Sequence, residues 1–332
     1  MASRSNVLTD PHAPWSRLRL RRTAHLRDLV AETTFSVAQL VQPVFVVEGL
    51  TGSEAIAGLG DDNARHGVAP ALEAIARDLD AGVRHFLLFA VPAAKQARTL
   101  DFGHLARSVD AIKARFGDAL HLWVDICLCS TTSHGHCSLL DDRGGIDLGP
   151  TLDALARSAV DVAAAGADGV SPSDMMDGRT ARIRAALDAS RHETVPIMSY
   201  STKFASQFYG PFRGAADSAP QHGDRRHYQI DVRSRRDAID SSIRCADEGA
   251  DLLMVKPGMT SLDLIAPIAA VTGKGVGAYQ VSGEYASLLA LAECGFSDFD
   301  AAYLETLHVL RRGGAAYIIT YGARRAKALG LA

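Results

Sequence analysis

Two lysines, Lys203 and Lys256, stand at or just beyond the ends of apolar segments. Lys256 follows the run LLMV at 252–255, which is typical of a strand that is buried on both faces. A lysine there keeps its aliphatic stem in the core, and the low polarity disfavours its ammonium form. A neutral amine can attack a ketone and form a Schiff base. The alternative is a structural lysine at the rim that pairs with a carboxylate.

Three cysteines, Cys127, Cys129 and Cys137, crowd into eleven residues that also hold His134 and His136. A Cys-x-Cys pair with a third cysteine soon after it can surround a soft divalent ion, and zinc is the ion that this set favours. Three thiolates and an open fourth position are the catalytic pattern, which we favour. Either histidine as a fourth ligand would make the site structural instead. The crowding and the odd total of five cysteines argue against a disulfide framework and for a cytoplasmic protein.

A segment of about thirty residues, roughly 207–232, is rich in glycine, arginine and aromatic residues. Loops of this length in compact domains are usually functional or disordered. Arginine binds both oxygens of a carboxylate through its planar guanidinium, so Arg213 and Arg225 suit a lid that closes over an acidic substrate. The alternative is a solvated basic loop that forms surface ion pairs.

The elements that must position these groups alternate along the chain. Apolar segments predict eight strands, at 40–47, 85–91, 120–126, 167–170, 195–200, 252–256, 276–281 and 315–320. Helical patterns are found at 69–81, 105–116, 151–165, 178–189, 234–248, 260–273, 284–294 and 298–312. Pro267 counts against an unbroken helix in the segment 260–273. Cys245 and Cys294 fall in helical segments and are expected to be buried.

This alternation predicts an α/β fold, a (β/α)8 TIM barrel over 37–332 that follows an N-terminal arm over 1–36. A doubly wound open sheet is the alternative, but no glycine-rich phosphate loop follows the first strand. The strands of a barrel end at one mouth, where active sites lie. Reactive groups do follow the predicted strands: Asp125, Cys127, Ser171, Ser173, Lys203, Lys256, Ser282 and Tyr321.

The whole-chain composition limits the possible partners. The chain has 332 residues, of which 47% are hydrophobic and 22% charged, and this is ordinary for a globular protein with a large core. A net charge of −3 and the lack of a long apolar run favour neither nucleic acid nor a membrane as a partner. The basic residues Arg17, Arg19, Arg21 and Arg22 resemble part of a transit peptide, but we favour an arm that packs on a neighbouring surface.

Several strings resemble the δ-aminolevulinic acid dehydratase family, also called porphobilinogen synthases, of the zinc–cysteine type. The matching strings are 132–137, 171–178, 197–206, 209–213, 223–226, 254–258 and 279–284. The likeness extends from about residue 17 to residue 321 and is strongest over 125–285. It implies a (β/α)8 barrel whose arm wraps a partner subunit, in homo-octamers or hexamers built from dimers.

The resemblance also implies a reaction and a set of site residues. The reaction condenses two molecules of δ-aminolevulinic acid into porphobilinogen with loss of two waters, an early step of tetrapyrrole and haem biosynthesis. Lys256 would form a Schiff base with the propionate-side substrate, and Lys203 would be linked to the acetate-side substrate. Zinc on the three cysteines would polarise the acetate-side substrate. The remaining roles fall to Asp125 and Ser173 near the acetate-side amino group, Arg213, Arg225 and Gln229 on the acetate-side carboxylate, Ser282 and Tyr321 on the propionate-side carboxylate, and Tyr209 and Phe212 as further substrate contacts.

The chain departs from the family pattern at several places. Ser241 stands where some relatives have a glutamate that binds an allosteric magnesium ion, so we do not expect that site. Gly322 and Thr131 replace aromatic residues that are usual in the family, and the segments 51–68 and 92–104 match poorly. These changes leave open a paralogous Schiff-base synthase or aldolase that acts on a related amino ketone, or a non-catalytic zinc-binding barrel.

Overall fold

The computed structural model describes residues 16–218 and 220–331, and the chain separates into two units between Thr34 and Phe35. The described part of the first unit holds α1 (Ser16–Arg19) and α2 (Ala24–Leu29). Thr23 caps α2, because its Oγ1 accepts a hydrogen bond of 3.2 Å from the Leu26 N–H, and no residue of α2 is buried. The beginning of the predicted arm, residues 1–15, lies outside the described residues.

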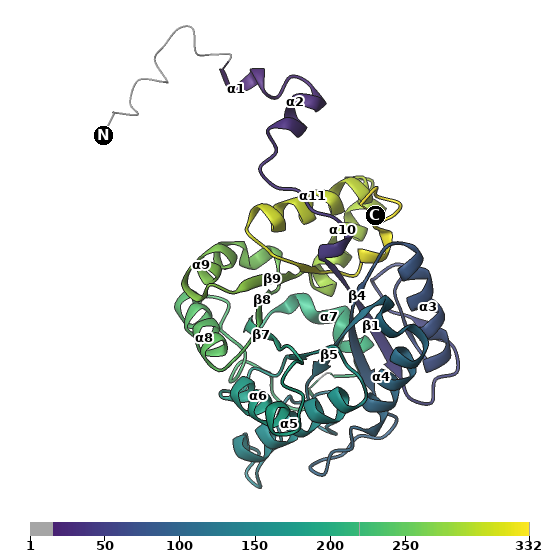
Figure 1. The fold of residues 1–332 in the computed structure, drawn as a ribbon, viewed down its shortest axis with the longest axis vertical. Helices are drawn as coiled ribbons and strands as arrows, with labels where there is room; N and C mark the ends of the chain where they lie inside the picture. Colours follow the sequence, from purple (N-terminus) through teal and green to yellow (C-terminus); the bar gives the residue numbers. More distant parts are fainter. Residues whose placement is uncertain (1–15, 219, 332) are drawn as a thin grey trace. The chain divides into compact units, whose positions relative to one another are not determined.

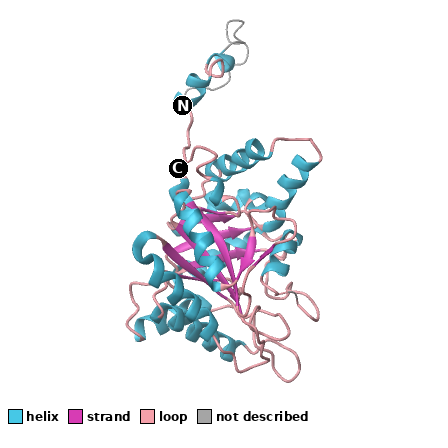
Figure 2. Cartoon of the chain, turned by 90° about the vertical axis from the view of Figure 1, so that its right-hand side faces the viewer, coloured by secondary structure: helices cyan, strands magenta, loops and turns pink. Residues whose placement is uncertain are grey.

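The second unit is a ring of parallel strands with helices around its outside (Figure 1), and the strands are enclosed by helices from the side as well (Figure 2). The strands of the ring are β1 (Leu40–Val47), β4 (His85–Val91), β5 (His121–Ile126), β6 (Gly169–Pro172), β7 (Met198–Lys203), β8 (Leu252–Lys256), β9 (Gly275–Tyr279) and β10 (Ile318–Ile319). They neighbour one another in the order β6, β5, β4, β1, β10, β9, β8, β7. A parallel bridge between Val170 and Ile197 joins β6 to the start of β7. The predicted barrel is confirmed, and the open doubly wound sheet is excluded.

Helices lie around the ring, and several of them are amphipathic. The helices are α3 (Val68–Asp80), α4 (Gly103–Phe116), α5 (Leu148–Ala164), α6 (Arg179–Ala189), α8 (Arg235–Asp247), α9 (Leu262–Thr272), α10 (Ser282–Glu293) and α11 (Phe299–Arg312). In α3 the buried residues Ala71, Ala74, Ile75 and Asp78 recur at the spacing of one helix face. None of the helices in the described ranges is both long and apolar enough to cross a membrane.

Several sequence-based expectations need correction. The hairpin β2 (Ser53–Ala55) and β3 (Ala64–His66) pairs with β1, although no strand was expected there. The helix α9 continues through Pro267. A proline inside a helix costs about 3 kcal/mol, but burial of Leu264, Ile265 and Ile268 stabilises this one by roughly 1.5–3 kcal/mol per side chain. Cys245 is buried as expected, whereas Cys294 is exposed.

The predicted lid is partly helical. It begins with the 3₁₀ turn η4 (Gln207–Tyr209) and the short helix α7 (Gly210–Ala215), with proline near the helix start. In the view of Figure 1, α7 lies across the opening of the ring. A parallel bridge between Phe204 and Ile230 brings the end of the lid back to the end of β7. The lid is therefore fixed at both ends beside Lys203.

A buried ion pair lies after β6, and its arginine also contacts β7. Asp174 and Arg179 are both fully buried, with 3.6 Å between Asp174 Oδ2 and Arg179 Nε. Arg179 also donates hydrogen bonds to the carbonyl oxygens of Met176, at 3.1 Å, and Tyr200, at 2.9 Å. Burial raises the pKa of Asp174 to about 6, although the Arg179 charge opposes this. The pair fixes the β6–α6 turn, which begins with Ser173, against the strand that carries Lys203.

We expect Arg179→Met to lower the free energy of unfolding by about 3–5 kcal/mol, because it leaves a buried carboxylate without its partner. The control is Arg182→Met in the same helix, which removes an exposed pair with Asp153 at 3.2 Å and should cost at most about 1 kcal/mol. Denaturant unfolding of both variants measures the difference. Equal losses would show that the Asp174–Arg179 pair contributes no more than a surface pair.

Candidate active site

The last residues of β7 and β8 place the two lysines side by side. Lys203 and Lys256 are register partners on these neighbouring parallel strands. Their exposed fractions are 6% and 3%, so neither amine can be well hydrated. Two residues distant in the sequence thus meet because the strands that carry them are adjacent in the barrel.

Aromatic rings surround the Lys256 amine. Its Nζ lies 4.0 Å from the ring centroid of Tyr279, 4.8 Å from Phe212, 4.9 Å from Tyr200 and 5.4 Å from Tyr209. Burial lowers the pKa of Lys256 well below its usual value, and the positive charge of Lys203 lowers it further. The amine therefore loses its proton at a lower pH than a free lysine does, and the neutral form is a nucleophile.

Lys203 lies among polar groups. Its ammonium donates a hydrogen bond to the backbone carbonyl of Ser173, which follows β6. Asp125, in β5, is near enough for the Lys203 charge to lower its pKa, but burial outweighs this and raises that pKa to about 6. The carboxylate Oδ1 of Asp125 has no hydrogen-bond partner in the described structure. Asp125 can therefore accept a proton or bind a substrate amine.

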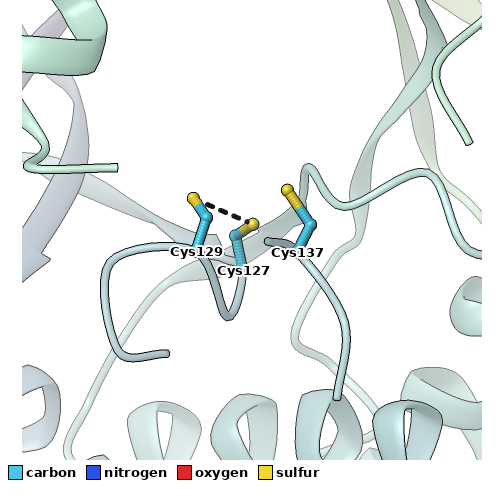
Figure 3. A group of neighbouring side chains, drawn as sticks. All are labelled: Cys127, Cys129 and Cys137. Carbon is cyan, nitrogen blue, oxygen red and sulfur yellow. Dashed lines mark hydrogen bonds between the residues drawn. The ribbon is translucent and has the colours of Figure 1, made fainter. Parts of the chain in front are cut away.

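The three thiols form one cluster, in which all sulfur atoms lie within 4.8 Å of one another. Figure 3 shows the sulfurs of Cys127, Cys129 and Cys137 pointing to the same side, and the first two are 3.4 Å apart. Hydrogen bonds from Cys127 and Cys129 lower the pKa of Cys137 well below that of a free thiol. Three convergent soft donors with one acidified thiol suit a divalent metal ion such as zinc.

The two neighbouring histidines form hydrogen bonds with groups other than the cysteines. His136 Nε2 lies 2.9 Å from the carbonyl oxygen of His222, and its Nδ1 lies 3.3 Å from the Tyr228 hydroxyl. His134 Nδ1 accepts a hydrogen bond of 3.2 Å from the His136 N–H. Within residues 16–218 and 220–331, the metal-type cluster comprises only the three cysteines. This geometry favours three thiolates and an open position over a closed site with a histidine.

Two arginines of the lid lie close to each other, and Arg225 also contacts the cysteine segment. Arg225 is buried and donates hydrogen bonds to the carbonyl oxygens of Gly135, at 2.9 Å, and Ser218. Burial lowers the pKa of Arg213, and the adjacent positive charge of Arg225 lowers it further. In the described structure the Nε atoms of both arginines and the amide nitrogen of Gln229 are buried without a hydrogen-bond partner. These donors could meet a carboxylate.

Ser282 and Tyr321 lie next to two of the aromatic residues that surround Lys256. The Phe212 N–H donates a hydrogen bond of 3.1 Å to Ser282 Oγ, at the start of α10. The ring centroid of Tyr321 is 6.4 Å from that of Tyr279, and the Tyr321 hydroxyl has no hydrogen-bond partner among the described residues. Tyr209 differs, because its hydroxyl donates to the carbonyl oxygens of Phe204 and Lys256. Tyr209 therefore presents its ring to the site and not its hydroxyl.

Three residues around Lys256 were not singled out from the sequence. Tyr200 and Tyr279 form part of its aromatic surroundings. The buried carboxylate of Glu284 accepts hydrogen bonds of 2.8 Å from the N–H groups of Met259 and Val281. It thereby joins the turn after Lys256 to the start of α10. The signal was present, because all three residues stand in the strings 197–206 and 279–284.

Ser241 makes a different contact from the one that a metal ligand would make. Its hydroxyl donates a hydrogen bond of 2.7 Å to the carbonyl oxygen of Ser201. Arg244 lies nearby and pairs with Asp177 at 2.7 Å. The position therefore carries no negative charge of its own.

Comparisons with known proteins agree on one family. The model of the family "Delta-aminolevulinic acid dehydratase" matches residues 16–329. The chain is 40% identical over 311 residues to the delta-aminolevulinic acid dehydratase of Halalkalibacterium halodurans, covering 92% of this chain and 94% of that one. The corresponding protein of Streptomyces coelicolor is 41% identical over 311 residues, with 92% and 94% covered.

A solved structure gives the same result. The crystal structure of the delta-aminolevulinic acid dehydratase (porphobilinogen synthase) of Toxoplasma gondii, in complex with the reaction product porphobilinogen, superposes with a TM-score of 0.90 at 37% identity. The match covers 93% of this chain and 90% of that one. The chain belongs to the delta-aminolevulinic acid dehydratase family, the lyases that condense two molecules of δ-aminolevulinic acid into porphobilinogen.

Proposed function

We propose that this chain makes porphobilinogen through Schiff bases on Lys256 and Lys203, beside a zinc ion on Cys127, Cys129 and Cys137. The observation that carries the proposal is the pairing of the two buried lysines at the ends of β7 and β8. A single buried lysine would have a structural explanation. Two adjacent buried amines serve a reaction that joins two ketones.

Lys256 would act first as a nucleophile. Its neutral amine attacks a substrate ketone, a C–N bond forms, and loss of water leaves an imine. The rings of Tyr279, Phe212, Tyr200 and Tyr209 exclude water from this bond. Lys203 would form the corresponding link to the second substrate, with Asp125 and Ser173 near the amino group of that substrate. The two imines would then hold both reactants at one place.

Two sets of polar groups would hold the substrate carboxylates. Arg213, Arg225 and Gln229 would bind the acetate side, and their unpartnered nitrogen atoms support this. Ser282 and Tyr321 would bind the propionate side, and the unpartnered Tyr321 hydroxyl supports that. Phe212 and Tyr209 would contact the substrate with their rings, since both face Lys256.

The cysteine cluster would hold a zinc ion. Thiolates are soft donors, and three of them leave one position open to substrate. When bound, the ion would supply a Lewis acid that polarises the acetate-side substrate. Arg225 lies beside the thiols. Burial lowers its pKa, but Cys137 and Cys129 raise that pKa by more, so the net shift is upward. Arg225 would therefore stay charged next to the cluster.

The N-terminal unit would contact other subunits. Residues 1–36 are proposed as an arm and 37–332 as the catalytic barrel, with the lid over about 207–232. The arm exposes Leu18, Leu20, Leu29 and Val30, with exposed fractions of 49%, 51%, 78% and 45%. Apolar side chains exposed this far are expected to be covered in a homo-oligomer, an octamer or hexamer of dimers. We further propose a cytoplasmic location, with neither nucleic acid nor a membrane as a partner.

We expect Lys256→Ala to abolish turnover, because no other group can replace the covalent intermediate. The measurement is pyrrole formation from δ-aminolevulinic acid, developed with an aldehyde colour reagent in the presence of zinc and a reductant. Lys327→Met, which removes an exposed lysine, is the matched control and should keep the wild-type rate. A wild-type rate in Lys256→Ala would remove the proposed role of Lys256.

The pH dependence of imine formation tests the effect of Lys203 on Lys256. A lowered pKa keeps the Lys256 amine neutral at lower pH, and imine formation is lost as the pH falls through that pKa. Lys203→Met removes the neighbouring positive charge, so the pKa should rise and the loss should move to higher pH. Borohydride trapping of the Lys256 imine across a pH series measures the midpoint. An unchanged or lower midpoint would contradict the proposed coupling.

We expect Cys129→Ala to lower the bound zinc per subunit and the rate of pyrrole formation together. The matched control is Cys294→Ala, which removes an exposed thiol outside the cluster. Metal analysis after dialysis against buffered zinc gives the stoichiometry. Full zinc content in Cys129→Ala would assign the cluster another purpose.

A further inference from the structure

The pocket beside the cysteines is small in this structure. The cavity that touches Asp125, Cys127, Cys129 and Phe212 has a volume of about 30 Å³. This is well below the roughly 300–1,000 Å³ that is typical of a small-molecule site, and each substrate is a five-carbon acid. Phe212 belongs to α7 of the lid, so the lid must move before the substrates can enter. Groups that hold the lid down therefore influence substrate binding.

Lys95 contacts the lid at Asp217. Its ammonium lies 2.7 Å from Asp217 Oδ2 and also donates a hydrogen bond to the Asp217 backbone carbonyl. Asp217 follows α7 and has a φ of 45°, in the left-handed region. Aspartate and asparagine adopt this conformation more readily than most residues. Lys95 therefore contacts both the side chain and the backbone of Asp217 at a bend of the lid.

The segment that carries Lys95 is itself anchored to the cysteine segment. The Gln96 N–H donates a hydrogen bond of 2.9 Å to the Thr131 carbonyl, and the Ser133 N–H donates one of 3.0 Å to the Gln96 carbonyl. Gln96 and Thr132 form a parallel bridge. Lys95 thus projects from a fixed base beside the proposed zinc ligands. It lies in 92–104, where the chain departs from the family strings.

The residue after Asp217 forms hydrogen bonds with both lid arginines. Asp217 is followed by Ser218, whose carbonyl accepts a hydrogen bond from Arg225 and whose N–H donates one of 3.0 Å to the Arg213 carbonyl. We propose that Lys95 is a positioning residue that latches the lid through Asp217 and so holds Arg213 and Arg225 over the acetate-side substrate. This inference rests on the proposed function for the role of the two arginines.

The test compares Lys95→Met, Lys95→Arg, Asp217→Asn and the control Lys327→Met. Two measurements are made: trypsin cleavage within residues 207–232 without substrate, and kcat and KM for pyrrole formation. Lys95→Met should raise both lid cleavage and KM about fivefold, the loss expected for a partly exposed ion pair and a charged hydrogen bond. Its kcat should change less than twofold, and imine trapping at Lys256 should persist.

The other variants distinguish a latch from a general loss of stability. Asp217→Asn keeps the backbone carbonyl and tolerates the left-handed conformation, so its effects should have the same direction and be smaller. Lys95→Arg keeps the charge and should restore most of the wild-type behaviour. Wild-type lid cleavage and KM in Lys95→Met would overturn the proposal, as would faster cleavage throughout the chain. If wild type forms no pyrrole, the proposed function fails, while lid cleavage still decides whether Lys95 is a latch.

Discussion

The site is built around the repulsion between two lysine amines that lie next to each other and are both buried. Adjacent parallel strands are about 5 Å apart, and two positive charges at that distance repel by on the order of 3 kcal/mol at an effective dielectric constant of 20. Both Lys203 and Lys256 are almost fully buried, so hydration cannot remove this cost. The cost is avoided if one amine is neutral. The surroundings of Lys256 favour its neutral form, because burial and the Lys203 charge both lower its pKa.

The other polar groups of the site also carry an energetic cost in the absence of substrate. Nitrogen atoms of Arg213, Arg225 and Gln229 and the hydroxyl of Tyr321 are buried without hydrogen-bond partners among the described residues. Leaving a buried donor unpaired costs about 1–3 kcal/mol, so several such groups in one place are expensive. Such a cost is tolerated where a ligand supplies the partners. The lid carries most of these groups, so its position controls the site, and the contact between Lys95 and Asp217 bears directly on that position.

Much of the site was predictable from the sequence because a barrel turns strand ends into neighbours. The apolar run before Lys256 predicted a buried strand, and the alternation of strands and helices predicted the mouth where Lys203, Asp125 and Cys127 meet. The resemblance then supplied the substrate and the roles of the lid arginines. Those roles, and the zinc ion, remain predictions.

Other features could not be predicted, because they depend on contacts between distant parts of the chain. The helix α9 survives Pro267 through burial of its apolar face, and Cys294 is exposed at the C-terminal cap of α10. The aromatic surroundings of Lys256 come from three separate segments, represented by Tyr200, Phe212 and Tyr279. No local pattern shows that their rings converge. The hairpin of β2 and β3 is likewise decided by its pairing with β1.

The most direct test of the central claim is to locate the covalent intermediate. The protein is incubated with δ-aminolevulinic acid and borohydride, digested, and mapped by mass spectrometry. The account predicts a reduced substrate adduct on the peptide that contains Lys256, with a second adduct, where one is trapped, on the peptide that contains Lys203. An active enzyme that carries adducts only on other lysines, or none at all, would contradict it.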